Sequence, residues 1–275
     1  MERYCNSKGT EEEKQYDLGI STKTADEDFC TQIDIQNEKL VMDGIRDKYP
    51  NDFIIGEETT GTGEVPSIDE NNPTWIIDPI DGTTNFASGI PLTCVSIGYC
   101  DNESRNNPEQ PVMGVIYAPV TKELYMAVTG YGAYRNGIQI TKKTPETAVT
   151  KVKKAVVCCE FGYPRDIGSI RKMTGAVENI LKNGCRTLRQ LGSGCLDICY
   201  VATGRLDVVY AGVASEGWKP WDYAAGLVIV KESGCVMEAI DQPSGTTEFD
   251  LYSKSLICAV SQELLEDCRK VVTSK

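Results

Sequence analysis

Residues 75–86 read WIIDPIDGTTNF, and this stretch decides which fold and which chemistry the sequence predicts. Its first three residues are apolar and predict a short buried strand that ends at Asp78. Pro79 then favours a non-helical turn, and Asp81 follows three residues after Asp78. The two carboxylates therefore converge at one point, just before Gly82.

Gly82 allows a ligand to approach the backbone closely. If a helix begins here, the free N–H groups of residues 82–84 bind an anion such as phosphate. The two carboxylates suit two hard cations that share Asp78, with phosphate lying between the cations and the helix end. A purely structural interpretation stays open, because Asp-Gly and Asp-Pro pairs mark turns and aspartate often caps helices.

Two other stretches place a carboxylate at the end or start of an element. Glu57 follows an apolar strand predicted for residues 53–55, and the alternative there is a solvated acidic loop. Asp222 stands at the head of a helix predicted for residues 223–232, and the alternative is an N-cap. Because the same pattern occurs three times, we favour a shared site over three unrelated turns.

The rest of the chain predicts a layered α/β architecture. Apolar residues recur at helical spacing over residues 33–49, with Asp34 near the first turn. Residues 92–140 predict antiparallel sheet with a hairpin turn at Asn136-Gly137. Beyond residue 156, strand-like and helix-like segments alternate, and a boundary between two packed halves is expected near residues 145–155.

Composition excludes several classes of chemistry. The chain has 275 residues and no histidine, which removes Ser-His-Asp and Cys-His catalysis and His-ligated zinc. Its formal charge of −12 disfavours nucleic acid or an anionic membrane as a partner. Hydrolytic chemistry must therefore come from carboxylates, hydroxyls and a hard metal.

The cysteine pattern and the polar first residues indicate the cellular compartment of the protein. Twelve cysteines are scattered without any Cys-x-x-Cys pair, which favours free thiols in a reducing compartment. No apolar run approaches the ~20 residues of a membrane span, and residues 1–14 are too polar for a secretory signal. We therefore expect a cytoplasmic protein.

Taken in order, the stretches around Glu57, residues 75–86 and Asp222 resemble the inositol monophosphatase family of lithium-sensitive, magnesium-dependent phosphatases. The resemblance extends from about Lys23 to the C-terminus. It implies an α-β-α-β-α sandwich of the inositol monophosphatase and fructose-1,6-bisphosphatase type, usually a homodimer. Residues 23–275 would form the catalytic domain. Residues 1–22 are expected to be a poorly ordered, polar segment that shortens the N-terminal helix layer.

The resemblance implies two or three Mg²⁺ ions in each active site. Glu57, Asp78 and the backbone carbonyl of Ile80 would hold the first ion. Asp78, Asp81 and Asp222 would hold the second, and a third, weaker ion is expected close to Glu57.

The resemblance also assigns residues to water and substrate. Thr83, together with Glu57, would position the attacking water, and Asp34 would support Thr83. Glu216 is the nearest candidate for the glutamate that holds a substrate hydroxyl. The full set of implied substrate contacts is Asp81, Gly82, Thr83, Gly192, Ser193, Gly194, Glu216 and Asp222.

The expected reaction is hydrolysis of myo-inositol monophosphate to inositol and phosphate by a metal-activated water. Alternatives from the same superfamily are other sugar phosphates, 3′-phosphoadenosine 5′-phosphate, fructose 1,6-bisphosphate and histidinol phosphate. A non-catalytic regulatory protein of this fold is the alternative from another class. Retention of all four metal carboxylates argues against it, because a silent protein has no need to hold four like charges together.

Overall fold

The computed structural model of the protein describes residues 19, 21–25, 28–69, 71–101, 110–141, 149–215, 218–242 and 248–274. Most of the segment 1–22 lies outside these residues, and so does Glu216. The shortened N-terminal helix layer expected before Lys23 falls there as well.

The larger sheet of the described chain is mostly antiparallel, as predicted for residues 92–140. Its strands, in spatial order, are β3 (Phe53–Gly56), β4 (Thr74–Asp81), β5 (Cys94–Cys100), β6 (Met113–Ala118), β7 (Glu123–Val128), β8 (Gly132–Arg135) and β9 (Ile138–Gln139). The pair β3–β4 is parallel and the others are antiparallel. The predicted turn at Asn136-Gly137 joins β8 to β9, and both residues have positive φ, 51° and 77°.

The smaller sheet is mixed. Its strands, in spatial order, are β11 (Thr187–Arg189), β10 (Val156–Glu160), β12 (Val208–Ala211), β14 (Leu256–Ala259) and β13 (Val236–Glu238). Strand β10 runs parallel to β11 and β12, whereas β14 runs antiparallel to β12 and β13. A separate short ribbon pairs β1 (Ser21–Ala25) with β2 (Asp28–Cys30).

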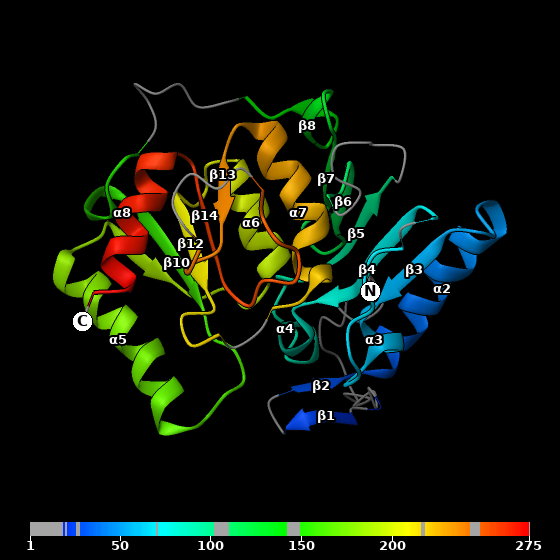
Figure 1. The fold of residues 1–275 in the computed structure, drawn as a ribbon, viewed down its shortest axis with the longest axis horizontal. Coiled ribbons are helices and arrows are strands. Elements are labelled where there is room, and N and C mark those ends of the chain that lie inside the picture. Colours follow the sequence, from blue (N-terminus) through cyan, green and yellow to red (C-terminus); the bar gives the residue numbers. More distant parts are fainter. Residues whose placement is uncertain are drawn as a thin grey trace, which may run out of the picture.

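Helices fill three layers around the two large sheets, so the predicted α-β-α-β-α order is confirmed (Figure 1). The helix α2 covers the outer face of the larger sheet, where Met42 and Ile45 pack on Ile77. Helices α6 and α7 lie between the sheets, and α5 and α8 cover the far face of the smaller sheet. The helix bounds are α2 (Gln32–Lys48), α3 (Glu57–Thr60), α4 (Thr83–Ala87), η1 (Val152–Lys154), α5 (Ile167–Asn183), α6 (Gly194–Ala202), α7 (Pro220–Ser233) and α8 (Gln262–Val272).

Helix α7 lies unusually close to the larger sheet. A Cβ at Gly114 of β6 would collide with the backbone carbonyl of Ala225. Glycine in the strand and alanine in the helix therefore let the two backbones approach. The consequence for the site is that the first turn of α7 is held at a fixed height above β4 and β5.

Candidate metal and phosphate site

Strand β4 departs from regular geometry at its end. Asp78 lies opposite Ser96 of β5 and Asp81 lies opposite Cys94, so three residue steps on β4 match two on β5. Residues three apart in a regular strand face opposite sides of the sheet, and the extra residue of this β-bulge returns Asp81 to the face of Asp78. Pro79, which has no N–H to pair, lies inside the bulge. The predicted strand end before Pro79 is therefore wrong, but the predicted convergence of the two carboxylates is confirmed.

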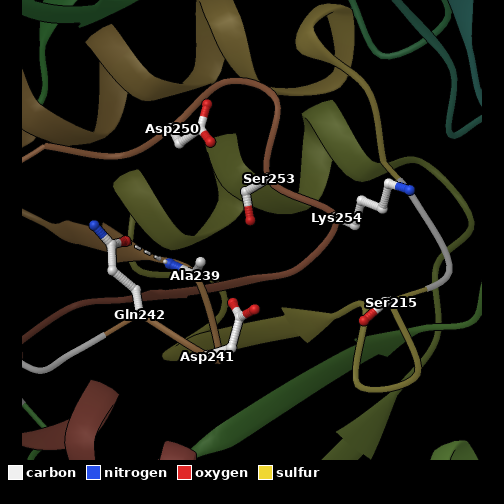
Figure 2. A pocket seen from close by; sticks show the side chains of 7 residues that line it. All are labelled: Ser215, Ala239, Asp241, Gln242, Asp250, Ser253 and Lys254. Atoms are coloured by element: carbon white, nitrogen blue, oxygen red, sulfur yellow. Dashed lines mark hydrogen bonds between the residues drawn. The ribbon is translucent and has the colours of Figure 1, made fainter.

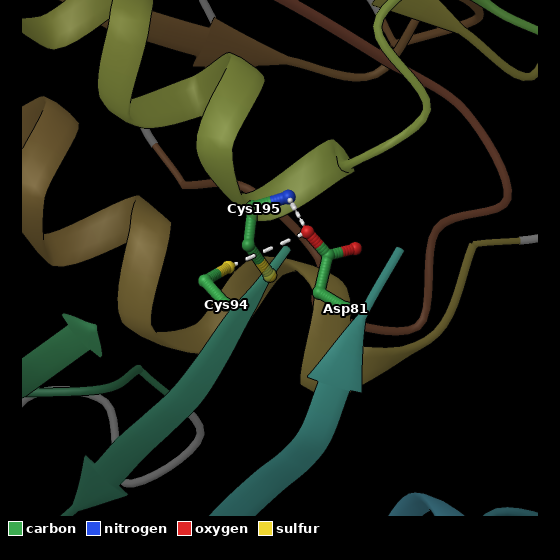
Figure 3. Close-up of side chains that lie close together, drawn as sticks. All are labelled: Asp81, Cys94 and Cys195. Carbon is green, nitrogen blue, oxygen red and sulfur yellow. Dashed lines mark hydrogen bonds between the residues drawn. The ribbon is translucent and has the colours of Figure 1, made fainter. Parts of the chain in front are cut away.

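Asp81 is held by the N-terminus of α6 (Figure 3). Its Oδ2 accepts hydrogen bonds from the backbone N–H of Cys195 at 3.0 Å, from the thiol of Cys94 at 3.5 Å and from the hydroxyl of Ser193. Its Oδ1 accepts the N–H of Gly194 at 3.2 Å and keeps a lone pair for another ligand. Burial raises the pKa of the Cys94 thiol, so this group donates a hydrogen bond instead of binding a metal as thiolate.

Asp222 completes a cluster of three carboxyl groups. Helix α7 begins at Pro220, three residues earlier than predicted, and Asp222 in its first turn accepts the N–H of Lys219 at 2.6 Å. One oxygen each of Asp78, Asp81 and Asp222 lies within 4.8 Å of the other two. The Oδ1 of Asp78 is buried and has no hydrogen-bond partner among the described residues. Because a bare buried carboxylate oxygen is costly, the cluster fits a hard divalent cation.

Glu57 opens α3 directly after β3. The ammonium of Lys23 in β1 lies 2.8 Å from one carboxylate oxygen each of Glu57 and Glu58. The buried carboxylate of Glu38 in α2 accepts the N–H groups of Glu58 at 2.8 Å and of Thr59 at 2.7 Å, which fixes the start of α3. Burial raises the pKa of Glu57 to about 7, in spite of the opposing charge of Lys23.

Thr83 links two elements of the site. As the first residue of α4, it places its hydroxyl 3.2 Å from Oδ1 of Asp34 and 3.1 Å from the carbonyl oxygen of Ile80. Asp34 is fully buried at the start of α2, where its Oδ2 accepts the N–H of Thr31 at 2.8 Å. The hydroxyl therefore donates its single proton inward and keeps its lone pairs for another donor. The structure thus brings together Asp34 and Thr83, the pair to which the resemblance assigns the attacking water.

The segment 191–194 packs against Gly82. Gly82 has a φ of 83°, and a Cβ there would lie 2.9 Å from the carbonyl oxygens of Gly192 and Leu92. The side-chain amide of Asn85 in α4 donates to the carbonyls of Leu191 at 2.7 Å and Leu92 at 2.9 Å. Only glycine fits this backbone, and the segment forms one wall beside the carboxylates.

Burial and mutual repulsion raise the pKa values of the clustered carboxyl groups. For Asp78 burial is the first cause, followed by the charges of Glu57 and Asp81. For Asp222 burial is again first, the hydrogen bond from Lys219 opposes it, and the charge of Glu57 adds to it. A bound cation removes this repulsion, and strongly perturbed groups in one place are typical of a functional site.

Sequence comparison identifies the family. A sequence model described as the inositol monophosphatase family matches residues 1–274. The chain belongs to the inositol monophosphatase family. It is therefore a phosphatase, as predicted.

Individual relatives and solved structures agree with that family. Inositol monophosphatase 1 of Solanum lycopersicum is 39% identical over 240 residues, which cover 87% of this chain and 80% of the relative. Inositol monophosphatase 1 of Homo sapiens is 33% identical over 257 residues, covering 93% and 86%. The extragenic suppressor protein suhB from Bartonella henselae superposes with a TM-score of 0.77 at 25% identity, covering 94% of this chain and 89% of that one. An IMPase from Thermotoga maritima gives 0.72 at 31% identity, covering 92% and 86%.

Some contacts in this member of the inositol monophosphatase family were not predicted. Lys23 lies in a polar stretch without periodicity and gave no signal. Glu38 follows Asp34 by one helical turn, so the same periodicity that predicted the helix places both carboxylates on one face. Ser193 was assigned to substrate, and the structure shows that its hydroxyl binds Asp81.

A hollow of about 390 Å³ is lined by none of the predicted site residues (Figure 2). Its lining is polar and consists of Ser215, Ala239, Asp241, Gln242, Asp250, Ser253 and Lys254. In the described ranges of the chain, every helix is too short or too polar to cross a bilayer.

Proposed function

We propose that this phosphatase hydrolyses myo-inositol monophosphate to inositol and phosphate, with Mg²⁺ as cofactor and water as nucleophile. The observation that carries the proposal is the cluster of buried Asp78 and Asp81 with half-buried Asp222, in which Oδ1 of Asp78 lacks a partner among the described residues. The names of the relatives from tomato and human support the substrate class.

The carboxylates suit the metal sites that family membership implies. Glu57, Asp78 and the carbonyl of Ile80 would hold one Mg²⁺, and Asp78, Asp81 and Asp222 would hold another, with a third, weaker ion near Glu57. All of these are oxygen ligands, which Mg²⁺ prefers. When bound, Mg²⁺ supplies neutralisation of the phosphate, activation of water and stabilisation of the leaving oxygen.

Thr83 and Asp34 would orient the attacking water. The inward direction of the Thr83 hydroxyl proton leaves an oxygen lone pair that accepts a hydrogen bond from water. Glu57 offers a second acceptor to the same water. A water held by two acceptors presents its own lone pair to phosphorus in a defined direction, and no covalent phosphoenzyme is needed.

The substrate would lie between the carboxylates and the segment 191–194. The backbone of Gly82 and Thr83 would meet the phosphate. Hydroxyl groups of the leaving alcohol would meet Asp81, Asp222 and the turn Gly192-Ser193-Gly194. We keep Glu216 as a proposed contact, although it lies outside the described residues.

Phosphate release from a panel of monoesters tests the proposal. The panel contains myo-inositol 1-phosphate, glycerol 2-phosphate, fructose 1,6-bisphosphate and 3′-phosphoadenosine 5′-phosphate, each with Mg²⁺ and with excess chelator. We expect the highest kcat/KM for the inositol ester, and no turnover in chelator until Mg²⁺ is added back. Full activity in excess chelator would contradict the metal-dependent mechanism. A higher kcat/KM for another ester would identify the class of that ester as the substrate.

We also propose a homodimer in the cytoplasm. The dimer rests on family membership, and the location rests on the acidic, cysteine-containing chain. Sedimentation equilibrium tests the dimer, because a single species of monomer mass across micromolar concentrations would contradict it.

A further inference from the structure

Asp197 in α6 is a buried acid outside the proposed metal site. It is fully buried, and no N–H or O–H group of the described residues donates to either of its carboxylate oxygens. One of these oxygens lies within 4.8 Å of both a Glu160 oxygen and the Cys158 sulfur of β10. Two ionised carboxylates cannot share such a place without a large cost, so one of the pair must carry a proton or bind a cation.

Hydrogen bonds decide which carboxyl group remains ionised. The Oε1 of Glu160 accepts the backbone N–H groups of Leu191 at 2.8 Å and Gly192 at 3.0 Å, and it faces the Cys158 thiol at 3.7 Å. Donors directed at one oxygen stabilise the charged form of that carboxyl group. Glu160 is therefore the carboxylate, and Asp197 is left to hold the proton.

We propose that Asp197 is a neutral carboxylic acid that donates its proton to Glu160, and that this pair positions the segment 191–194 against the phosphate site. Glu160 holds the N–H groups of Leu191 and Gly192, and the next residues of the same segment bind Asp81. Asp197 and Glu160 are thus positioning residues, which act through the segment and do not touch substrate.

The surroundings of Asp197 favour the neutral form. Burial, followed by the charge of Glu160, raises the pKa of Asp197 well above its usual range, and the Cys158 thiol opposes this only in part. The other titratable groups that act on it or feel its charge are neutral or negative: Cys158 and Cys159 of β10, Cys258 of β14, Asp81 of β4 and Tyr200 of α6. A cation bound by Cys158, Glu160 and Asp197 is the alternative to a shared proton.

The pH dependence of unfolding distinguishes a proton on Asp197 from a structural contact. A carboxyl group with a raised folded-state pKa stabilises the fold fully below the unfolded pKa of about 3.9, and this contribution is lost as pH rises toward the folded-state value. Asparagine stays neutral and can donate to Glu160 at every pH. Above about pH 4, the unsubstituted protein should therefore lose stability relative to Asp197→Asn as pH rises. The ratio of its equilibrium constant for unfolding to that of Asp197→Asn should increase by up to about tenfold per pH unit. Parallel curves would overturn the proposal.

Two further measurements complete the test on the full chain with Mg²⁺. Infrared spectra should contain a protonated-carboxyl C=O band that Asp197→Asn removes, and its absence would contradict the neutral acid. Asp197→Leu, which cannot donate, should have a kcat/KM at least roughly tenfold below that of Asp197→Asn, the expected effect of one lost charged hydrogen bond. Equal values for the two variants would overturn the positioning claim.

Metal analysis and the choice of readouts keep the outcome unambiguous. If the unsubstituted protein contained stoichiometric Zn²⁺ and Asp197→Asn did not, these side chains would form a metal site and the shared-proton proposal would be wrong. The proposal rests on the proposed function only in assigning phosphate to this segment, and the unfolding and infrared readouts require no substrate. If Asp197→Leu fails to fold, Asp197→Asn still decides. A panel without phosphatase activity would overturn the proposed function and leave these two readouts intact.

Discussion

Asp222 combines a structural and a chemical contribution in one side chain. Its Oδ2 accepts the N–H of Lys219, which satisfies the free donor of the residue that precedes α7. Its carboxyl group also lies within 4.8 Å of those of Asp78 and Asp81. An asparagine in its place keeps an acceptor for Lys219 and removes the charge, so the two contributions are separable by one substitution.

The substitution Asp222→Asn should lower turnover by more than about 100-fold, which exceeds the usual effect of losing an outer-shell partner of a metal ligand. Without metal, the variant should unfold at the same temperature as the unsubstituted protein or at a higher one, because a buried repulsion is gone. Phosphate release and thermal unfolding in chelator measure both effects. The control Asp43→Asn removes an exposed carboxylate paired with Lys39 and should change neither quantity.

Asp34→Asn should reverse a hydrogen bond. The amide NH₂ would donate to the Thr83 hydroxyl, which then has fewer lone pairs to hold a water. We expect kcat to fall by roughly 10- to 100-fold while Mn²⁺ binding, followed by electron paramagnetic resonance, stays near normal. A parallel loss of Mn²⁺ affinity would place Asp34 among the metal ligands instead.

Local sequence patterns reveal Asp78, Asp81 and Asp222 because each stands beside an element boundary. Contacts between distant stretches carry no such signal. Lys23 meets Glu57 across 34 positions, and Glu160 meets Leu191 across 31. Only the pairing of strands and helices brings these residues together, so their contributions become visible in the fold alone.

At the scale of elements, the close packing of α7 on β6 determines how far Asp222 lies from the larger sheet. The sequence predicted a helix over residues 223–232 and antiparallel sheet over residues 92–140, but the alanine and glycine that let α7 and β6 approach have no apolar pattern of their own. It also ended the strand β4 too early, because proline usually stops a ladder and a bulge is not marked locally. Elements were therefore more predictable than the distances between them.

Gly114→Ala should destabilise the protein by roughly 1–3 kcal/mol, since the added methyl meets the backbone of α7 and not a flexible side chain. Displacement of α7 should also raise the Mg²⁺ concentration needed for half-maximal activity. Urea unfolding and a Mg²⁺ titration measure the two effects. The matched control Gly44→Ala, in an exposed turn of α2 with nothing within 4 Å, should stabilise by about 0.5–1 kcal/mol.

At the scale of the molecule, the site takes one residue or more from each of three layers. Asp34 comes from the outer helix α2, Asp78 and Asp81 come from the larger sheet, and Asp222 comes from the central helix α7. Four acidic groups therefore meet only when the layers assemble. Without a cation, burial and the charges of neighbouring carboxylates raise the pKa values of Asp78, Asp81 and Asp222.

Mg²⁺ binding should release protons and become tighter as pH rises, because the raised pKa values of Asp78, Asp81, Asp222 and Glu57 let protons compete with the metal. Without metal, the free energy of unfolding changes with pH in the opposite direction to the Mg²⁺ affinity. These groups stabilise the fold at low pH, and the contribution is lost as pH rises through their raised pKa values. Calorimetric titrations in two buffers of different ionisation enthalpy measure the protons, and urea unfolding in chelator measures the stability. Heats that do not depend on the buffer would contradict this linkage.

The bulge at the end of β4 also determines which length changes the gene can tolerate. In a regular strand every second residue faces the same side of the sheet. The bulge lets Asp78 and Asp81 share a face although they are three residues apart. Losing one residue between them would restore an ordinary ladder and keep both acids on one face, but without the kink that turns the chain toward Thr83. Gaining one would send Asp81 to the α2 side. Substitutions can therefore accumulate within this stretch, whereas its spacing must be inherited unchanged.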